Sequence, residues 1–493
     1  MAKLELVDVS VRDGNQSLWG AVGLNAQQIL TVAPIMDRVG FRALDFCSST
    51  HMGVSVRNHR QNPWELIRNA KALMPNTLLQ LIGTGFRFIS WEVMHPDFMQ
   101  LVYDRLVASG IERFVVLDPM HDWEAIESVA RMVKKAGGSE VMGALTYTIS
   151  PVHDDAFYVG LAEKMGKCPD IDRAYLKDPS GLLMPERARQ LIPALVKALG
   201  GKALELHSHC TIGLAPLTYM AAAELGVSVL HVASGALSSG GSLPDGERVV
   251  DNLHALGHSV EVDRRQLSLV ASYFSRLAQA EGLPAGTPQE FDAGFLRHQM
   301  AGGAITTLKR QLEELKLGHR FDEVMEEIMR VREELGSPIM VTPFPQMLST
   351  QAVQNILGKE RYANVSDQII RYLNGRFGRP TGPVDPNVRD RIMDRPRARE
   401  LADEPPPLPP SELRKRFSPG ISDEEFLLRA VMPAEQVDAM IAAGPAPRHY
   451  NPDTRTLLKL LKEMQSRTDV NDILIEKPNF SLRLKQGSES AHV

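Results

Sequence analysis

The stretch Leu204-Glu205-Leu206-His207-Ser208-His209-Cys210 has the pattern of a buried β-strand that ends on two histidines. The leucines alternate with other residues, and successive side chains of a strand face opposite sides. His207 and His209 stand two positions apart, so both imidazoles lie on one face and can bind one cation together. A His-x-His pair alone is also typical of structural histidines, so the rest of the chain has to decide between these readings.

Seven further strand-like runs accompany this stretch, and most of them precede a helical segment. The eight runs are 4–11, 41–47, 77–82, 113–117, 140–148, 174–177, 203–209 and 227–233. Amphipathic segments between them include 25–39, 63–73, 123–136, 186–199 and 216–225. Strands that alternate with helices over about 250 residues predict an α/β fold, a (β/α)8 TIM barrel. A doubly wound open sheet is the alternative, but no Gly-x-Gly-x-x-Gly motif follows an early strand.

Active sites of TIM barrels lie at the C-terminal ends of the strands, and three runs end on polar residues. The first run ends in Arg12-Asp13-Gly14-Asn15-Gln16, the sixth in Lys177-Asp178-Pro179-Ser180-Gly181, and the seventh in His207-Ser208-His209. Each could be ordinary surface polarity when taken singly. Because the strand ends of a barrel meet at one mouth, we expect these side chains to lie together.

Helical periodicity replaces the alternating pattern beyond about residue 255. Helices are expected at 264–280, 305–316, 321–334, 349–357 and 365–374. The Pro-rich stretch 404–410 predicts an extended linker, followed by two or three short helices and a frayed end at 486–493. We therefore expect a barrel domain at 1–255, an all-α C-terminal domain at 256–400, and a linker with a tail at 401–493, a possible docking segment.

Composition and charge narrow the class of protein. The 493 residues are 43% hydrophobic and 23% charged, with a formal net charge of -5, which gives no reason to expect nucleic acid or an anionic membrane as partner. The three cysteines, Cys47, Cys168 and Cys210, are scattered and predict a reducing compartment. No signal peptide and no transmembrane run is apparent. A cytoplasmic protein with small-molecule partners is expected.

Asp13, His207 and His209 supply one carboxylate and two imidazoles, a ligand set that suits zinc first, with manganese or cobalt as alternatives. Lys177 is the unusual member, because a dication repels an ammonium group. It must be displaced, deprotonated or converted, and carbamylation by carbon dioxide would make it an anionic oxygen ligand. The alternative is an ordinary salt bridge between Lys177 and Asp178, or a charge at a helix end.

Several motifs carry a family resemblance. Within the barrel they are 7–18 (VDVSVRDGNQSL), 147–153 (YTISPVH), 176–183 (LKDPSGLL) and 206–209 (LHSH). Beyond it they are 296–303 (LRHQMAGG), 330–336 (RVREELG), 341–343 (VTP) and 378–383 (GRPTGP). Over most of residues 3–395 the chain resembles the carboxyltransferase domain of biotin-dependent carboxylases, a family that includes pyruvate carboxylase, the oxaloacetate decarboxylase alpha subunit and transcarboxylase.

The resemblance implies a site and a reaction. It implies that Asp13, a carbamylated Lys177, His207 and His209 bind the metal, and that Arg12 and Gln16 polarise the carbonyl of an acceptor. Lys177 also distinguishes this family from isopropylmalate-synthase-like enzymes, which share the first-strand and His-x-His motifs. In the family's reaction a carboxyl group passes between carboxybiotin and an enolate or carbanion of the acceptor. The alternative for Arg12 is a structural ion pair with a barrel acid.

Partners follow from what the 493 residues lack. No Met-Lys-Met biotinylation motif and no biotin carboxylase domain occurs in them. The resemblance therefore implies that a biotin carboxyl carrier protein and a biotin carboxylase act as separate chains, and that the chain forms a homodimer.

Two departures from the family concern the acceptor. The family's third strand ends in LLRG, whose arginine binds the acceptor carboxylate, whereas this chain has Thr84 in Leu81-Ile82-Gly83-Thr84-Gly85. Arg87 could compensate, or it could be a surface charge. After the eighth strand the family has a proton-relay threonine, where this chain has Gly241, and Ser239 or Ser242 could replace it. Cys210, which follows the second histidine, is expected to be a packed thiol.

These observations predict a metal-dependent carboxyltransferase subunit whose acceptor is a small carbonyl compound other than plain pyruvate. One alternative is a biotin-independent decarboxylase or aldolase-type lyase on the same barrel. The other is a non-catalytic scaffold of a carboxylase complex, against which the four convergent ligand residues argue.

Overall fold

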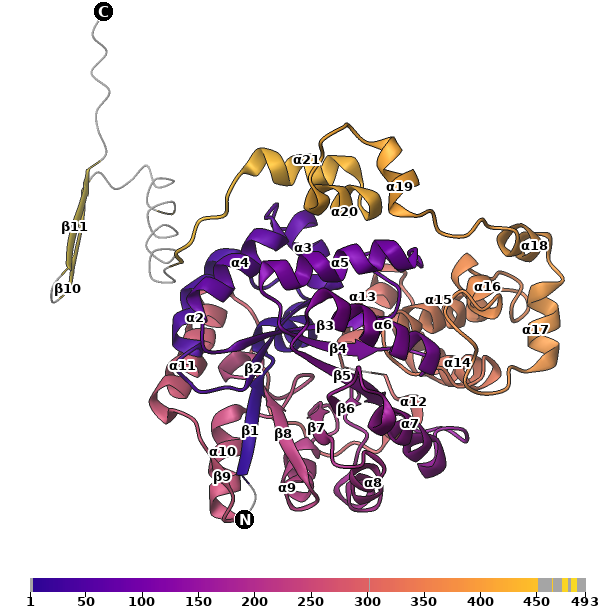
Figure 1. Cartoon of the computed structure of the whole chain (residues 1–493), viewed down its shortest axis with the longest axis horizontal. Coiled ribbons are helices and arrows are strands. Elements are labelled where there is room, and N and C mark those ends of the chain that lie inside the picture. The colour runs from indigo at the N-terminus through magenta and orange to yellow at the C-terminus, as the bar shows by residue number, and fades with distance from the viewer. Residues whose placement is uncertain (1–2, 301, 451–462, 464–471, 478–479, 486–493) are drawn as a thin grey trace, which may run out of the picture.

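Residues 3–260 form a closed parallel barrel (Figure 1) in a computed structural model that describes residues 3–300, 302–450, 463, 472–477 and 480–485. Its strands are β1 (Lys3–Asp8), β2 (Ala43–Ser48), β3 (Leu78–Thr84), β4 (Arg113–Leu117), β5 (Glu140–Thr146), β6 (Arg173–Asp178), β7 (Ala203–Ser208) and β8 (Val227–Val232). β1 pairs with both β8 and β2, which closes the sheet, and the short β9 (Ser259–Val260) pairs with β1. The eight predicted strands are confirmed, and the open sheet is wrong.

Helices cover the outside of the barrel. They are α2 (Ala26–Met36), α3 (Ser49–Arg57), α4 (Pro63–Leu73), α5 (Pro96–Ser109), α6 (Trp123–Ala136), α7 (Asp155–Lys167), α8 (Pro185–Ala198), α9 (Ala215–Glu224), α10 (Gly246–Ala255) and α11 (Arg264–Glu281). α6 shows why these helices form. Asp122 caps the N-terminus of α6 by accepting from Glu124 N at 3.0 Å. The helix buries Ile126, Val129 and Val133 on one face.

A helical region follows the barrel and has a hydrophobic core of its own. Its helices are α12 (Gly294–His298), α13 (Gly302–Glu314), α14 (Phe321–Glu334), α15 (Phe344–Leu357), α16 (Asp367–Leu373), α17 (Pro386–Met393) and α18 (Pro396–Ala402). Leu312, Val324 and Phe344 lie in this second core, which also includes Met120 from the barrel. Gln299 joins the two parts, since it accepts from Thr148 Oγ1 at 2.8 Å and donates to Ile149 O at 2.7 Å.

The chain then runs without regular structure over 404–409, as the Pro-rich stretch predicts, and returns across α3 and α5 (Figure 1). Its helices there are α19 (Pro410–Leu413), α20 (Asp423–Val431) and α21 (Ala434–Ala443). Phe426 anchors α20 against Phe98 of α5, with ring centroids 5.9 Å apart.

An antiparallel hairpin of β10 (Asp472–Lys477) and β11 (Phe480–Lys485), which the sequence analysis did not predict, completes the described tail. The frayed end expected at 486–493 lies outside the described residues. α11 packs its Leu267, Val270 and Phe274 into the core of the barrel. The division at 255 and 400 stays a prediction.

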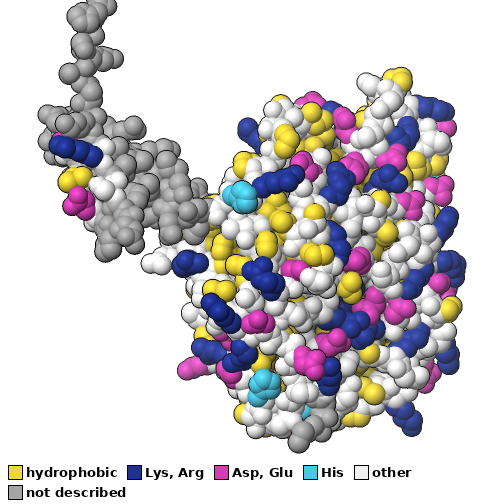
Figure 2. Space-filling model, turned by 60° about the vertical axis from the view of Figure 1, so that its left-hand side comes forward, with side chains coloured by type: hydrophobic (Ala, Val, Ile, Leu, Met, Phe, Trp, Pro, Cys, Tyr) yellow, Lys and Arg dark blue, Asp and Glu magenta, His cyan; other side chains and the backbone are white. Residues whose placement is uncertain are grey.

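The face drawn in Figure 2 is mixed in charge. Figure 2 shows Lys and Arg interspersed with Asp and Glu over one face, without a large patch of either sign. No helix in the described part of the chain is long and apolar enough to span a membrane.

The barrel interior holds charged residues below its mouth. Glu205 on β7 is fully buried, forms an ion pair with Arg113 of β4, and lies 3.1 Å from His231 Nε2 through its Oε2 atom. Arg113 Nε also donates to Glu140 at 2.5 Å. Burial raises the pKa of Glu205, but the charge of Arg113 and the hydrogen bond with His231 outweigh it and lower that pKa to about 2.

Replacing Glu205 with glutamine is expected to lower the free energy of unfolding at pH 7 by about 3 kcal/mol, because the variant leaves the buried Arg113 charge less compensated. The folded-state pKa is depressed below the ordinary value of 4.5, so Glu205 stabilises the fold above that pH and loses this effect as pH falls towards 2. Thermal unfolding at pH 7, 5 and 3 should show a gap between wild type and variant that narrows at pH 3. Glu163→Gln, at an exposed position of α7, is the control and should unfold like wild type at every pH.

Candidate active site

The end of β1 shapes the first wall of the mouth. The chain passes through one π-helical turn, Ser10–Gly14, into α1 (Asn15–Trp19), and such turns are frequent at functional sites. Asp8 holds the turn by accepting from Ser10 N at 2.8 Å and from Ser234 Oγ at 2.8 Å. Gly14 is required sterically, because a Cβ there would lie 2.8 Å from Leu237 O. The turn directs Arg12 and Asp13 into the barrel.

Asp13, His207 and His209 converge at the mouth. Asp13 Oδ2 lies 3.0 Å from His207 Nε2, Asp13 Oδ1 lies 3.5 Å from His209 Nε2, and the two Nε2 atoms are 3.2 Å apart. All three residues are buried. Their ligand atoms lie within 4.8 Å of one another, a spacing that allows one ion to contact all three. The sequence predicted this meeting of the first and seventh strands.

Lys177 joins them from β6. Its Nζ lies 3.7 Å from Asp13 Oδ2, and the side chain is buried. Burial, and then the charge of Arg12, lower the pKa of Lys177 to about 8. The alternative salt bridge to Asp178 is wrong, because Asp178 points to the other side of the strand and accepts from Leu182 N at 2.8 Å and Leu183 N at 2.9 Å.

Arg12 forms a buried ion-pair chain. Its NH1 lies 2.7 Å from Asp13 Oδ2, its Nε donates to Asp45 Oδ2 at 2.9 Å, and its NH2 donates to the same oxygen. The expected ion pair with a barrel acid is therefore present, and it places the guanidinium beside the histidine cluster. Because two of its nitrogens bind one carboxylate, the guanidinium is held in one orientation, as a group that donates to a ligand needs to be.

Hydrogen bonds from neighbouring groups orient the side chains of His209 and Asp13. His209 Nδ1 lies 2.7 Å from Gly241 O, which leaves Nε2 facing Asp13, and Ser17 Oγ donates to Asp13 Oδ1 at 2.9 Å. Outer contacts of this kind are typical of histidines and carboxylates that bind metals. Cys210 is buried, and burial raises the pKa of its thiol to about 12, as expected of a packed thiol.

The protonation states of Asp13 and His207 at pH 7 suit the binding of a cation. Burial raises the pKa of Asp13, but Arg12, His209 and Lys177 outweigh it and hold that pKa well below the ordinary value. Burial, opposed by the hydrogen bond with Asp13, holds the pKa of His207 well below its ordinary value. Asp13 is therefore a carboxylate and His207 a neutral imidazole at pH 7, the protonation states in which both bind metals.

The other predicted site residues are less closely tied to this cluster. Gln16 is half-buried on α1, one turn after Arg12, and Thr84 is half-buried at the end of β3. Ser239 has a positive φ of 66° and is half-buried in the turn after β8. Ser242 is fully buried, and its Oγ lies near the position that a Cβ of Gly14 would take, at 3.5 Å.

Arg87, the candidate replacement for the family's arginine on β3, is held by other contacts through two of its nitrogens. It is buried, its Nε donates to Trp91 O at 3.2 Å, and its NH2 donates to Arg376 O at 3.0 Å. Its guanidinium also lies over the ring of Phe377, 5.0 Å from the centroid. These contacts direct Arg87 towards the helical region.

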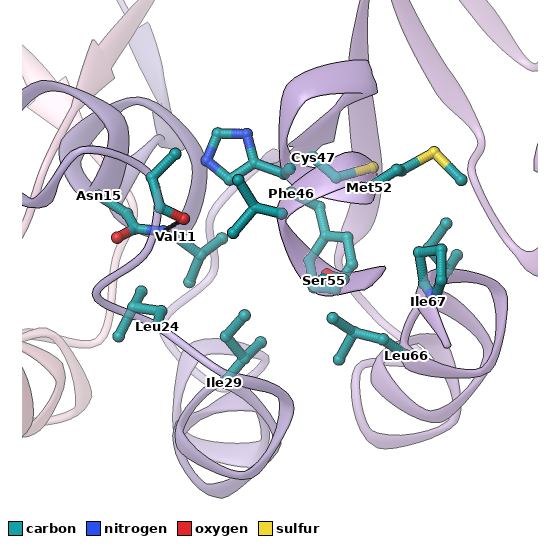
Figure 3. A pocket seen from close by; sticks show the side chains of 14 residues that line it. Val11, Asn15, Leu24, Ile29, Phe46, Cys47, Met52, Ser55, Leu66 and Ile67 are labelled. Atoms are coloured by element: carbon teal, nitrogen blue, oxygen red, sulfur yellow. Dashed lines mark hydrogen bonds between the residues drawn. The ribbon is translucent and has the colours of Figure 1, made fainter. Parts of the chain in front are cut away.

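A small pocket behind the π-helical turn is apolar (Figure 3). Val11, Leu24, Ile29, Phe46 and Ile67 line it, between the end of β2 and helices α2 and α4. These are the faces on which the barrel wall packs against its outer helices. The pocket therefore belongs to that packing and offers an acceptor few polar groups.

Sequence reasoning missed the groups that hold the site in place. Asp45 lies in none of the motifs, and the contacts that Ser17 and the Gly241 carbonyl make were not foreseen although both residues lie in stretches that the sequence analysis singled out. Period-two alternation along β2 could have found Asp45, because it is an acid among Ala43, Leu44, Phe46 and Cys47.

Fold and site together define a (β/α)8-barrel enzyme with a candidate divalent-metal site at its mouth. Comparison with known proteins gives the family. A model of a conserved carboxylase domain matches residues 295–472. One of the pyruvate carboxylase subunits of Methanocaldococcus jannaschii is 31% identical over 496 residues, which cover 99% of this chain and 86% of that protein. The chain belongs to the carboxyltransferase subunits of biotin-dependent carboxylases.

Two further relatives agree with this family. The 2-oxoglutarate carboxylase large subunit of Hydrogenobacter thermophilus is 28% identical over 91% of this chain and 70% of its own length. The carboxyl transferase domain of Rhizobium etli pyruvate carboxylase has the same fold, with a TM-score of 0.81 and 21% identity over 99% of this chain and 84% of that one. The chain is a biotin-dependent carboxyltransferase, and the comparisons support neither the biotin-independent lyase nor the scaffold.

Proposed function

We propose that this subunit moves a carboxyl group between carboxybiotin on a separate carrier chain and a small carbonyl acceptor other than plain pyruvate, with a divalent metal held by Asp13, Lys177, His207 and His209. The convergence of Asp13 with the two histidines at the mouth carries the proposal. Zinc suits these ligands best, with manganese or cobalt as alternatives. When bound, the ion would supply a positive charge near an oxygen that becomes enolate-like.

Carbamylation would remove the repulsion between the Lys177 ammonium group and a divalent metal ion. The ammonium first loses one proton to solvent. The amine nitrogen then forms a bond to the carbon of carbon dioxide, one C–O electron pair moves to oxygen, and a second N–H proton leaves to solvent. The product is an anion where an ammonium stood 3.7 Å from Asp13. Asp13 and the modified lysine would then offer two negative charges to a dication, and His207 and His209 complete the set.

Arg12 and Gln16 would act on the acceptor. The guanidinium keeps a fixed orientation through Asp45, so its remaining N–H groups can donate to a carbonyl oxygen as negative charge develops there. The amide of Gln16, one turn further along, can donate to the same substrate. Burial of Arg12 at 3% exposure strengthens these interactions, because little water competes with them.

Charge at the mouth bears on the acceptor. Within the described part of the chain, the nearby cations are already engaged: Arg12 with Asp13 and Asp45, Lys177 with Asp13, and Arg87 with backbone carbonyls. The position of the family's carboxylate-binding arginine is occupied by Thr84. A plain 2-oxo acid such as pyruvate would therefore find no guanidinium fork for its carboxylate, which supports a different acceptor.

Thr84→Arg is expected to raise kcat/KM for pyruvate at least about 10-fold, because an arginine fork binds a carboxylate through two charge-assisted hydrogen bonds. Steady-state carboxyl transfer to pyruvate measures this. Thr84→Gln, of similar length but uncharged, should not produce the gain. Equal pyruvate turnover by wild type, Thr84→Gln and Thr84→Arg would contradict the assignment of this position.

A biotinylated partner tests the proposal as a whole. The native protein would be purified gently from its source, and the co-purifying chains would be probed with streptavidin. We expect a biotinylated polypeptide that is separate from this chain. A biotin carboxylase chain, a homodimer of this subunit and a cytoplasmic location belong to the same proposal. A metal-containing preparation that reproducibly lacks any biotinylated chain would contradict the separate carrier.

A further inference from the structure

The segment that follows α11 lies along the rim of the barrel mouth. We call residues 284–299 the rim segment; apart from the short α12, it has no regular structure. Its first residue is tied to α1, because Trp19 Nε1 donates to Pro284 O at 2.7 Å. Its last residue is tied to the loop after β6, because Ser180 Oγ donates to Gln299 O at 2.7 Å. The rim segment therefore joins the first strand's side of the mouth to the sixth strand's side.

Between these ends the rim segment crosses the loops after β8 and β7 at very close range. Gly286 N donates to Ala236 O at 2.9 Å, and a Cβ at Gly286 would lie 2.0 Å from Ser238 O. A Cβ at Gly213, in the loop after β7, would lie 2.4 Å from Gln289 O. Both distances are shorter than real Cβ atoms show, so only glycine lets the backbones meet at these two crossings.

The loops that the rim segment crosses surround His209. In the loop after β8, the Gly241 carbonyl accepts from His209 Nδ1 at 2.7 Å, and the Ser242 carbonyl accepts from Cys210 N at 2.7 Å. The loop after β6 is also close, since a Cβ at Gly181 would lie 2.4 Å from His209 O. The rim segment thus contacts both of the loops that touch His209 and the loop that follows it.

The turn over residues 238–242 transmits a displacement at one end to the other. It is short and closed by a backbone hydrogen bond, in which Ser242 N donates to Ser239 O at 2.9 Å. The carbonyl that lies against Gly286 and the carbonyl that holds His209 are three residues apart in this turn. Moving the first therefore moves the second.

We propose that the rim segment is a positioning element of the metal site: it clamps the loop after β8, which holds the Gly241 carbonyl on His209 Nδ1 and keeps Nε2 of His209 directed at Asp13. A carbonyl that accepts from Nδ1–H leaves Nε2 unprotonated, the form that binds a metal. The effect on metal binding rests on the proposed metal site. The position of the imidazole in the metal-free chain does not depend on that site.

Gly286→Ala tests the clamp, because its added methyl carbon must displace Ser238 O. We expect the dissociation constant for zinc, measured by competition with a chelating dye, to rise about 10-fold, as for the loss of a contact that orients a ligand. Gly160→Ala, where a Cβ on α7 meets no atom within 4 Å, is the control and should bind zinc like wild type.

A second control separates the clamp from general instability. Gly282 follows α11 with a φ of 68° and open space around its Cβ position, so Gly282→Ala strains the backbone without touching the loop after β8. It should lower the temperature of thermal unfolding and leave the zinc affinity unchanged. Wild-type zinc affinity in Gly286→Ala, or an equal loss of affinity in Gly282→Ala, would overturn the proposal.

Hydrogen exchange of the wild type tests the clamp without a variant, and decides if Gly286→Ala fails to fold. If the rim segment positions His209 for the metal, bound zinc stabilises the rim segment in return, because coupling between two sites is reciprocal. Exchange in peptides covering 235–242 and 284–293 should slow when zinc is added, and exchange in α20 should not. Equal exchange of these peptides with and without zinc would overturn the proposal.

The imidazole signals of a histidine-labelled, metal-free sample keep this proposal apart from the proposed function. The His209 signal, assigned by its absence in His209→Gln, should shift in Gly286→Ala and stay in place in Gly160→Ala. A wild type that binds no zinc would contradict the proposed metal site, and a shifted His209 signal in Gly286→Ala would still support the clamp. An unshifted His209 signal in that variant would overturn the clamp.

Discussion

Replacing Lys177 with alanine is expected to reduce the bound metal from about one ion per chain to a small fraction, and to lower carboxyl transfer at least about 1000-fold. The variant keeps Asp13, His207 and His209, but loses the fourth group that lies 3.7 Å from Asp13. Elemental analysis of the purified proteins measures the metal, and mass spectrometry under carbon dioxide measures the expected 44 Da addition on Lys177, about the mass of one carbon dioxide molecule.

Lys135→Ala, at an exposed position of α6, is the matched control, because it removes a lysine of equal size far from the mouth. It should retain both metal and activity. Wild-type metal content in Lys177→Ala would defeat the assignment of Lys177 as a ligand, even if activity were lost. Loss of metal in the Lys135→Ala control as well would show that the preparation, and not the site, sets the metal content.

The conservative change Arg12→Lys is expected to lower kcat/KM at least about 100-fold while most of the metal is retained. Lysine keeps the positive charge but cannot contact Asp13 and Asp45 from three nitrogens, as Arg12 does. The buried Asp45 would lose part of its compensation, so the free energy of unfolding should also fall, by about 3 kcal/mol.

Steady-state kinetics, elemental analysis and thermal unfolding of the same preparation separate these effects. Arg68→Lys is the control, since Arg68 pairs with Glu424 at the surface and should tolerate the change. If Arg12→Lys turned over at the wild-type rate, Arg12 would be a structural ion pair alone. If it lost its metal entirely, its main role would be to support Asp13.

The fold could be predicted because the barrel strands are short, apolar and separated by amphipathic helices. β4 (Arg113–Leu117) and α6 (Trp123–Ala136) have the expected bounds to the residue. The hairpin β10–β11 was missed even though Phe480–Lys485 alternates apolar and polar residues and Asp472–Lys477 holds the apolar run Ile473-Leu474-Ile475. Its sequence signal was present but was read as part of a helical tail.

The site could be predicted only where a motif marked it. Asp13, Lys177, His207 and His209 stand at strand ends, and the barrel geometry brings strand ends together. The partners that fix them come from other strands and loops: Asp45 from β2, and the Gly241 carbonyl from the loop after β8. Such contacts depend on the register and depth of a side chain in the barrel, which a single sequence does not reveal. The role considered for Ser242, whose side chain is fully buried, stays a prediction.

Transfer of a labelled carboxyl group from biotin tests the central claim most directly. The metal-loaded full chain would be incubated with carboxybiotin whose transferable carboxyl group is labelled with ¹⁴C. The mixture would also contain a panel of small carbonyl acceptors that includes pyruvate, 2-oxoglutarate and uncharged ketones. With the wild-type chain we expect acid-stable label in at least one acceptor other than pyruvate. With the Lys177→Ala variant in its place we expect no labelled acceptor. Label that leaves only as carbon dioxide, at the same rate with wild type, with Lys177→Ala and with no protein, would contradict the account.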